Sequence, residues 1–433
     1  MRKDVRKKAC LISFISLPCL FSFLANAAEP AIPAGMEQAI RAAMQTHPDV
    51  MAADSQMLSA HSQVQAGDYR WFPRAEVSAR TGKSGDRYSV IGLQQTLWDA
   101  GRLNADYEAV KANEQAALSG KSAAMETIGM AAANAYLNLA RAREQLQVAE
   151  ENVKEHRKLH FSVLKRSDGG IGSKSDVTLA ISRLQQARAA ARQWQGEVGR
   201  AEAAYLSVIG TEAPVSQLQA PALWEVENGR AGVIARVNAR SPSLQKLREE
   251  VRVAEAVVDS KKAQLYPSLY ARIDNTRYFG DSPVDNDTRF SINFEWQNDV
   301  ALSQRYQIES AQHQVMAARR ALESEGRRLT EAASSYWDDY MTAINRTAEL
   351  DQFAASADET VQLFKRQFTI GRRSWPEVMN SLQDLYAARN QKVDARYAAM
   401  ASRMRLAFLG GEMDGLLGLR APASLQNDAA GQP

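Results

Sequence analysis

The chain of 433 residues contains two copies of one unit, and this duplication restricts its fold more than any other feature. Pro48 and Pro73 are 25 residues apart, and Pro242 and Pro267 show the same spacing at an offset of 194. Farther along, the offset grows to 199 and then to 201, as short loop insertions would produce. The pattern predicts two similar units of roughly 200 residues each. We expect repeat 1 over 28–211, a connector over 212–232, repeat 2 over 233–411 and a flexible tail over 412–433.

Long stretches of each unit have the periodicity of supercoiled helices. Apolar and alanine residues step alternately by 4 and 3 from Ala135 to Val163, and again from Ala180 to Val208. An average step of 3.5 residues is typical of coiled coils. Residues 102–165 contain no proline, so they can form one helix of about 95 Å. We expect helices over about 102–165, 175–209, 302–368 and 375–409.

Four short segments have the alternating pattern of β-strands, paired as two hairpins. They cover about 75–80, 88–99, 268–274 and 289–298. Aromatic residues such as Trp71, Trp98 and Tyr266 gather at the strand ends, as in the girdles of membrane barrels. An aromatic hairpin core in a soluble protein is the alternative. A sheet that spans a membrane must close, and four strands are too few, whereas three chains would supply twelve.

The N-terminus has the pattern of a secretory signal peptide over 1–27. Basic residues precede an apolar run that is too short to span a bilayer, and an A-x-A site ends at Ala27. Cys10 and Cys19 both lie in this segment, so the mature chain can form neither a disulfide nor a cysteine metal site. Lipidation of Cys19 is the alternative, although Pro18 stands where a small residue is expected.

Composition and spacing give no indication of catalysis or of nucleic-acid binding. The formal net charge of the whole chain is only +3, whereas nucleic-acid-binding domains are usually strongly basic. His156 and His160 have a zinc-ligand spacing, but both lie on the coiled-coil seam and no third ligand is apparent. The glycines of 169–172 lack the GK[ST] ending of a phosphate loop. We therefore expect no enzyme activity, cofactor or metal.

Both expected helix reversals carry one motif, a glycine followed seven residues later by valine after an acidic residue. The two copies run from Gly170 to Val177 and from Gly371 to Val378, at an offset of 201. Together with the duplication and the paired prolines, they make residues 45–411 resemble the TolC family of outer-membrane efflux and secretion channels. The resemblance implies a mainly α fold with a membrane β-barrel. Three chains would share twelve strands in the outer membrane, and an α-helical barrel would extend into the periplasm.

The resemblance also implies the partners and the site. The partners would be two further copies of the chain, a periplasmic adaptor (membrane fusion protein), an inner-membrane transporter and outer-membrane lipid. The tips that dock the adaptor would contain Gly170, Ile171, Gly371 and Arg372. The periplasmic gate would contain Asp176, Ser175, Arg373, Phe368, Glu377 and Asn380.

Within that gate, Asp176 and Ser175 match the family's acidic and hydroxyl partners, and Arg373 matches their basic partner. The family's tyrosine falls at Phe368, which has no hydroxyl group. The family's acidic ring falls at Glu377 and Asn380, of which only Glu377 keeps the charge. Ordinary helix-cap and surface charges are the alternative interpretation of these residues.

The resemblance leaves two classes of cargo. Drug-efflux members often carry an acylated N-terminal cysteine, and the mature chain has no cysteine, which slightly favours type I protein secretion over multidrug or small-molecule efflux. A periplasmic coiled-coil adaptor or a structural protein would share the helices and the signal peptide. Neither would require four aromatic-edged strands at duplicated positions.

Overall fold

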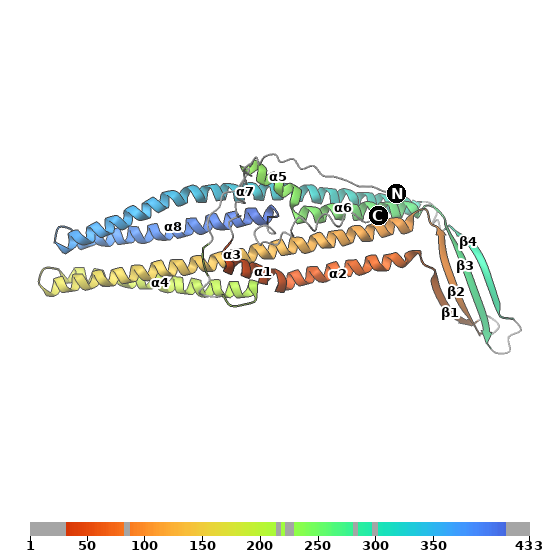
Figure 1. Cartoon of the computed structure of the whole chain (residues 1–433), viewed down its shortest axis with the longest axis horizontal. Helices are drawn as coiled ribbons and strands as arrows, with labels where there is room; N and C mark the ends of the chain where they lie inside the picture. Colours follow the sequence, from red (N-terminus) through yellow and green to blue (C-terminus); the bar gives the residue numbers. More distant parts are fainter. Residues whose placement is uncertain are drawn as a thin grey trace, which may run out of the picture.

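The structure is a computed structural model that describes residues 32–81, 87–213, 218–220, 229–279, 285–296 and 302–412. The signal peptide expected over 1–27 and the tail beyond residue 412 lie outside these ranges. Eight α-helices, one short 3-10 helix (Tyr69–Trp71) and four strands are present in the described part (Figure 1). None of these helices combines the length and the apolar character needed to cross a membrane.

Two very long helices run through the helical part of the molecule, α3 (Arg102–Asp168) and α7 (Leu302–Thr369). At about 1.5 Å per residue, each is about 100 Å long. The shorter helices are α1 (Ala34–Thr46), α2 (Pro48–Asp68), α4 (Lys174–Ile209), α5 (Gly229–Arg240), α6 (Pro242–Ala263) and α8 (Trp375–Leu409). Pro48 and Pro242 stand in the first turns of α2 and α6, where proline's missing N–H has no intrahelical partner to lose.

The shorter helices stand end to end beside the long ones. In the half nearer the sheet, α3 packs against α2 and α6, and α7 packs against α6. In the other half, α3 packs against α4 and α8, and α7 packs against α8 (Figure 1). The hairpins α3/α4 and α7/α8 therefore reverse at the same end of the molecule, opposite the sheet.

The strands form one antiparallel sheet in the order β1-β2-β3-β4. Their bounds are β1 (Arg74–Thr81), β2 (Arg87–Trp98), β3 (Ser268–Phe279) and β4 (Asp287–Glu295). The expected mainly helical fold with four strands per chain is confirmed. β3 continues past the expected residue 274 because it pairs with β2 as far as Phe279, opposite Arg87. β1 and β4 each have one edge without a strand partner in the described chain, which leaves backbone donors and acceptors available.

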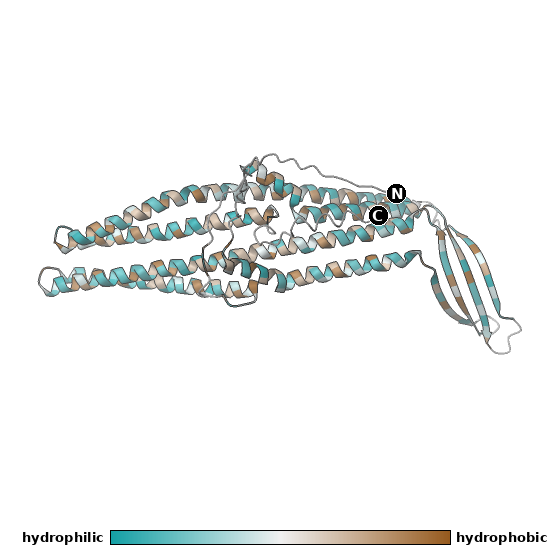
Figure 2. Ribbon diagram, viewed as in Figure 1, coloured by the Kyte–Doolittle hydropathy of each residue, from teal (hydrophilic) through white to brown (hydrophobic). Residues whose placement is uncertain are grey.

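One face of the sheet is apolar yet exposed. Residues that stand opposite each other across paired strands share a face, so Val77, Ile91, Asn275 and Thr288 mark one side. The large apolar members of this side, each 46–74% exposed, are Val77, Ile91, Leu93, Ile273, Phe290, Ile292 and Phe294. We call this side the apolar face and the other the polar face. The brown and teal alternation along the strands is visible in Figure 2.

The buried core is concentrated midway along the helices. Residues of α3 such as Tyr136 and Leu139 pack there with Met36 and Ile40 of α1 and with Phe408 of α8. Small residues permit this close approach: a Cβ on Gly129 would lie 2.8 Å from the Phe408 ring. The seam is alanine-rich, and helix axes can approach closely where side chains are small.

Candidate functional site at the helix-reversal tips

The first tip, residues 169–173, joins α3 to α4 through a turn that requires glycine. Gly170 has a φ of +73°. The N–H of Ile171 donates to the carbonyl of Arg166 at 2.8 Å, which closes the end of α3. Ser173 then caps α4: its hydroxyl accepts from the N–H of Asp176 at 3.1 Å, and its own N–H donates to the Asp176 carboxylate at 3.2 Å.

The second tip, residues 370–374, repeats this design between α7 and α8. Gly371 has a φ of +77°, and the N–H of Arg372 donates to the carbonyl of Gln367 at 2.9 Å. Ser374 donates its N–H at 3.0 Å and its hydroxyl at 2.7 Å to the carboxylate of Glu377. The shared capping pattern explains why an acidic residue occupies the same place in both motif copies.

Arg373 is held within its own hairpin. Its guanidinium forms an ion pair with Glu377 at 2.6 Å, donates to the Gln367 side chain at 3.1 Å and lies 4.0 Å from the centre of the Phe364 ring. The hydroxyl of Ser374 and the Arg373 guanidinium lower the pKa of Glu377 to about 2. Glu377 is therefore ionised at neutral pH, and its charge is directed at its own helix cap and at Arg373.

Asp176 makes its contact with the second tip through Trp375. A hydrogen bond from the Trp375 side chain, followed by those from Ser173, holds the pKa of Asp176 below its usual range. Across the described residues of one chain, no ion pair joins Asp176 to Arg373. The structure thus brings Asp176 to the second tip, as the resemblance implied, but beside the indole of Trp375 rather than beside a guanidinium.

A second bridge joins the tips through Arg166, near the end of α3. Its Nη1 donates to the backbone carbonyl of Phe368 at 3.0 Å, and its guanidinium lies 4.9 Å from the centre of the Phe368 ring. Lys365, one turn earlier on α7, forms an ion pair with Glu155 of α3. Both contacts connect the hairpin α3/α4 to the hairpin α7/α8.

A buried apolar cluster lies behind these polar bridges. Phe368 and Trp375 are each only 8% exposed. They pack with Val163 of α3, Ala180 of α4 and Val378 of α8, among other residues. Phe368 is therefore a core residue of the tip region that also presents its carbonyl to Arg166.

The other expected site residues are on the surface. Ser175 bonds through its hydroxyl to that of Ser173 at 2.7 Å, and Asn380 is exposed on α8. Ile171 is 73% exposed, and Arg372 is also exposed at the turn of the second tip. Ile370, which sequence reasoning did not select, is 65% exposed. Both tips therefore end in a large uncovered isoleucine beside a glycine turn.

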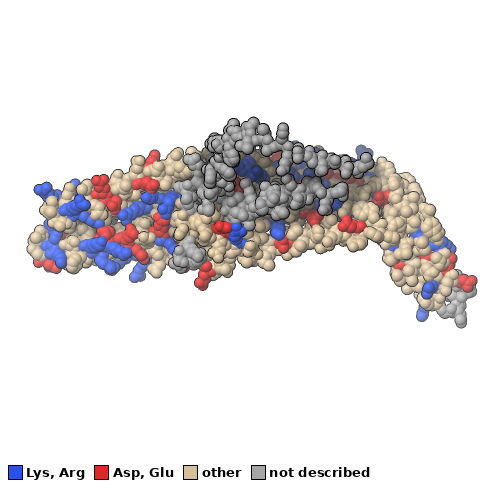
Figure 3. All heavy atoms as spheres, in the orientation of Figure 1, with Lys and Arg blue, Asp and Glu red and all other residues tan. Residues whose placement is uncertain are grey.

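Sequence reasoning missed Arg166 and Trp375. Arg166 has no arginine at the duplicated position, where Gln367 stands, so the repeat gives no signal for it. Trp375 has a weak signal, because a large aromatic residue is unusual directly before Pro376 at the start of an otherwise polar helix turn. Charged side chains of both signs crowd the tip half of the molecule in Figure 3, so charge alone would not single out either residue.

A row of ion pairs continues the connection between the hairpins toward the middle of the molecule. Arg389 of α8 bonds to Glu151 of α3 at 3.0 Å and to Asp358 of α7 at 2.8 Å. Farther along, Arg396 pairs with Glu144 of α3. The pairs with Glu151 and Glu144 join the two hairpins and resist separation of α3 from α8, whereas the pair with Asp358 lies within the hairpin α7/α8.

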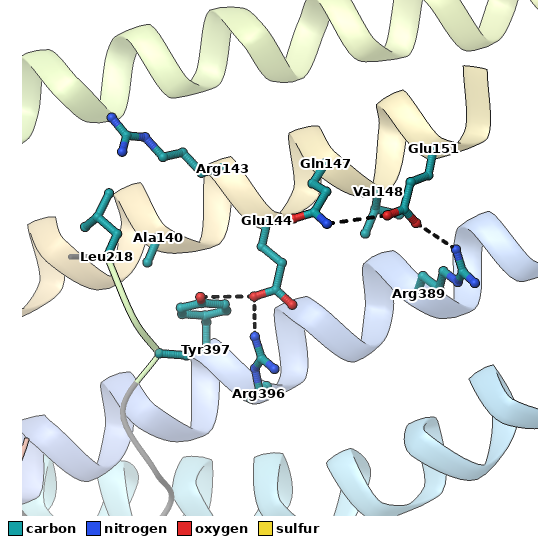
Figure 4. A pocket seen from close by; sticks show the side chains of 11 residues that line it. Ala140, Arg143, Glu144, Gln147, Val148, Glu151, Leu218, Arg389, Arg396 and Tyr397 are labelled. Carbon is teal, nitrogen blue, oxygen red and sulfur yellow. Dashed lines mark hydrogen bonds and ion pairs between the residues drawn. The ribbon is translucent and has the colours of Figure 1, made fainter. Parts of the chain in front are cut away.

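A hollow of about 490 Å³ lies along this row between α3, α8 and residues 218–220 (Figure 4). Tyr397 donates to Glu144 at 3.1 Å inside it, and burial followed by the Glu144 charge raises the pKa of Tyr397 to about 12. Glu144 and Glu151 are each paired with an arginine of α8. The arrangement clamps α3 to α8.

Comparison with known proteins agrees with this geometry. A family model described as outer membrane efflux protein matches residues 39–211 and 233–412. Protein CyaE of Bordetella pertussis is 27% identical over 198 residues, which are 44% of this chain and 42% of CyaE. Outer membrane efflux protein BepC of Brucella suis is 23% identical over 283 residues, which are 64% of this chain and 62% of BepC. The matched stretches cover less than two thirds of either relative.

The fold also resembles that of solved channels. The crystal structure of the CmeC outer membrane channel of Campylobacter jejuni is 14% identical to this chain. The two superpose with a TM-score of 0.75 over 98% of this chain and 97% of the other. At this identity the likeness concerns the fold, which extends over both hairpins and the sheet.

Proposed function

Because the chain belongs to the outer membrane efflux protein family, whose members are outer-membrane channels that reach into the periplasm, we propose that it is the outer-membrane component of a tripartite export complex. Three copies would form one conduit. The sheets would build a twelve-stranded barrel in the membrane, and the helices would build a tunnel below it.

One observation carries this proposal: the sheet exposes an apolar face and has two edges without a partner. Phe290, Ile292 and Phe294 on β4 are each more than 60% exposed, which is costly in water but favourable against lipid. The open edges of β1 and β4 supply the hydrogen-bonding groups that neighbouring copies need. When several chains close a barrel in a membrane, the apolar face meets lipid and each open edge pairs with a strand of the neighbouring chain.

The tips would be the docking surface for a periplasmic adaptor, which in turn connects the channel to an inner-membrane transporter. This proposal is supported by the position of Ile171 and Ile370 at the end farthest from the sheet, both largely exposed. Gly170, Gly371 and Arg372 would set the shape and charge of that surface.

The same tips would form the periplasmic gate. Within a chain, the bridge from Arg166 to Phe368 and that from Trp375 to Asp176 would keep the hairpins together in the closed state. Ser175, Asp176 and Arg373 would act with the neighbouring copies. Glu377 and Asn380 would line the constriction, where the missing second carboxylate makes the acidic ring weaker.

The gate proposal is tested by single-channel recording in planar bilayers with the double variant Asp176→Ala/Arg373→Ala. A higher open probability than the wild type, with intact trimers, is the expected result. Unchanged conductance and open probability would remove both residues from the latch. The Asp176→Ala single variant keeps the Arg373–Glu377 pair, so comparing it with the double variant separates loss of that pair from loss of the contact between tips.

Two classes of cargo are candidates. Cleavage after Ala27 would remove both cysteines, and with them any acylated N-terminal cysteine, which favours type I protein secretion. The similarity to BepC, an outer membrane efflux protein, favours efflux. Deleting the chain and comparing secreted proteins with susceptibility to drugs and metal ions distinguishes the two. Native mass measurement in detergent tests the channel itself, because a stable folded monomer would contradict it.

A further inference from the structure

The charges of the sheet are sorted by face. Strand register places all four carboxylates of the strands on the polar face, namely those of Glu76, Asp274, Asp287 and Glu295. Four arginines share that face: Arg74, Arg80, Arg272 and Arg289. Within the four strands, the apolar face carries only two charged residues, Arg87 and Arg277, and both are basic.

These two arginines are neighbours. Arg87 stands opposite Phe279, and Arg277 stands opposite Ser89 on the same pair of strands. They are therefore diagonal partners, whose side chains begin about 7–8 Å apart. Two guanidinium groups on such long side chains can reach one group placed between them.

Among the described residues, no carboxylate compensates either positive charge. Arg277 donates to the Asn275 side chain at 3.2 Å, and neither arginine has an ion pair with a described acidic residue. The polar face differs: Arg272 pairs with Asp274 at 2.8 Å, and Arg289 pairs with Asp287 at 3.2 Å. Both Arg87 and Arg277 are exposed.

The two arginines also share one position along the length of the strands. Arg277 comes four residues after Ile273, and Arg87 comes four residues before Ile91. At about 3.4 Å per residue, Arg277 lies about 14 Å along its strand from Ile273, and Arg87 lies about 14 Å from Ile91. They stand at the loop end of the sheet, away from the helices, next to Phe279, which is 58% exposed. This is where the apolar band meets a polar boundary.

We propose that Arg87 and Arg277 bind the phosphate groups of lipids in the outer leaflet, while the acyl chains of those lipids lie against Ile91 and Ile273. This inference rests on the proposed function, because it takes the apolar face to be the membrane face. Arginine suits the role since its planar guanidinium donates two parallel hydrogen bonds to a phosphate. The site occurs once in each chain and anchors the outer rim of the barrel to the headgroups.

The test measures lipid binding by native mass spectrometry of the full mature protein in detergent. The probes are a diphosphorylated lipid A and the same lipid without its phosphates. The variant Arg87→Gln/Arg277→Gln removes both charges from the apolar face, and Arg80→Gln/Arg289→Gln removes two from the polar face as a matched control. We expect the first variant to bind the phosphorylated lipid roughly 30-fold more weakly, equivalent to about 2 kcal/mol, and the control to bind like the wild type.

A conservative variant, Arg87→Lys/Arg277→Lys, keeps the charges and should restore part of the binding. Excess inorganic phosphate should not displace the lipid, because the acyl chains contribute to its binding. Equal binding by the wild type and the glutamine variant, equal loss in the control, or displacement by free phosphate would each overturn the inference. Heat-resistant trimer bands and bilayer conductance are recorded on the same samples. A conducting trimer without phosphate preference refutes this inference alone, whereas failure to insert refutes the proposed function.

Discussion

The guanidinium of Arg166 donates a hydrogen bond to the backbone carbonyl of Phe368 at 3.0 Å, which ties the end of α3 to the end of α7. Because the acceptor is a carbonyl of the main chain, the bridge does not depend on the missing phenolic hydroxyl at Phe368. The Phe368 side chain is buried in the cluster behind it, so its backbone is held in place for Arg166. A polar bridge backed by an apolar cluster joins the two hairpins of a chain at the tips.

Replacing Arg166 with alanine should loosen the closed gate. The lost bond is charge-assisted but partly solvated, so we expect about 1 kcal/mol per chain. Loss of that stabilisation in each copy shifts the population toward the open state by roughly fivefold or more. Open probability in planar bilayers is the measurement. Lys165→Ala is the matched control, because the Lys165 ammonium lies over Phe161 of its own helix. An equal increase in both variants would show that a general loss of positive charge is responsible.

Valine in place of Gly170 or Gly371 should reduce export without reducing the amount of trimer. Nothing lies within 4 Å of an added Cβ at either position, so the effect comes from the positive φ alone. A β-branched residue there should cost about 1–2 kcal/mol. Export rate and trimer level in outer-membrane fractions are measured side by side. Gly199→Val is the control, because Gly199 in α4 has free space and lacks a positive φ. Normal export by both tip variants would argue against the tips as the docking surface.

The cap at Glu377 should make tip stability depend on acidic pH. Its pKa in the folded chain is lowered to about 2 from the ordinary value of 4.5. A lowered pKa means that the stabilisation is fully present above about pH 4.5 and is lost as the pH falls toward 2. The difference in Tm between the wild type and Glu377→Gln should therefore shrink over that window. Ser374→Ala, which removes the main donor, should flatten the dependence. A Tm difference that stays constant down to pH 2 would contradict the assignment.

Lysine in place of Ile292 should block insertion of the sheet. Ile292 is 62% exposed on the apolar face, and a lysine facing lipid near the bilayer midplane costs about 2–4 kcal/mol. Heat-resistant trimer bands in outer-membrane fractions are the readout. Asn293→Lys places the same charge one residue along, on the polar face, and should be tolerated. Equal trimer levels in the two variants would show that the apolar face does not meet lipid.

The sequence alone predicted those features of the structure that depend on local patterns along the chain. The 3.5-residue seam and the absence of proline are one-dimensional patterns, and they predicted a helix over 102–165 where α3 covers Arg102–Asp168. Alternation predicted all four strands for the same reason. That Asp176 lies near the second tip was implied by the family resemblance and not by the motif itself.

Only the tertiary structure decided which partner each tip residue takes. The pair of Arg373 with Glu377 is the exception, because it is local: Arg373 directly precedes the N-cap Ser374, and Glu377 lies in the first turn of α8. Asp176 meets Trp375, and Arg166 meets Phe368, only because two hairpins about 200 residues apart in sequence pack side by side. That Arg87 and Arg277 lie on the same face of the sheet likewise depends on the strand register between β2 and β3. Periodicity along one chain carries no information about how two segments are aligned, since alignment is decided by packing and hydrogen bonding between them.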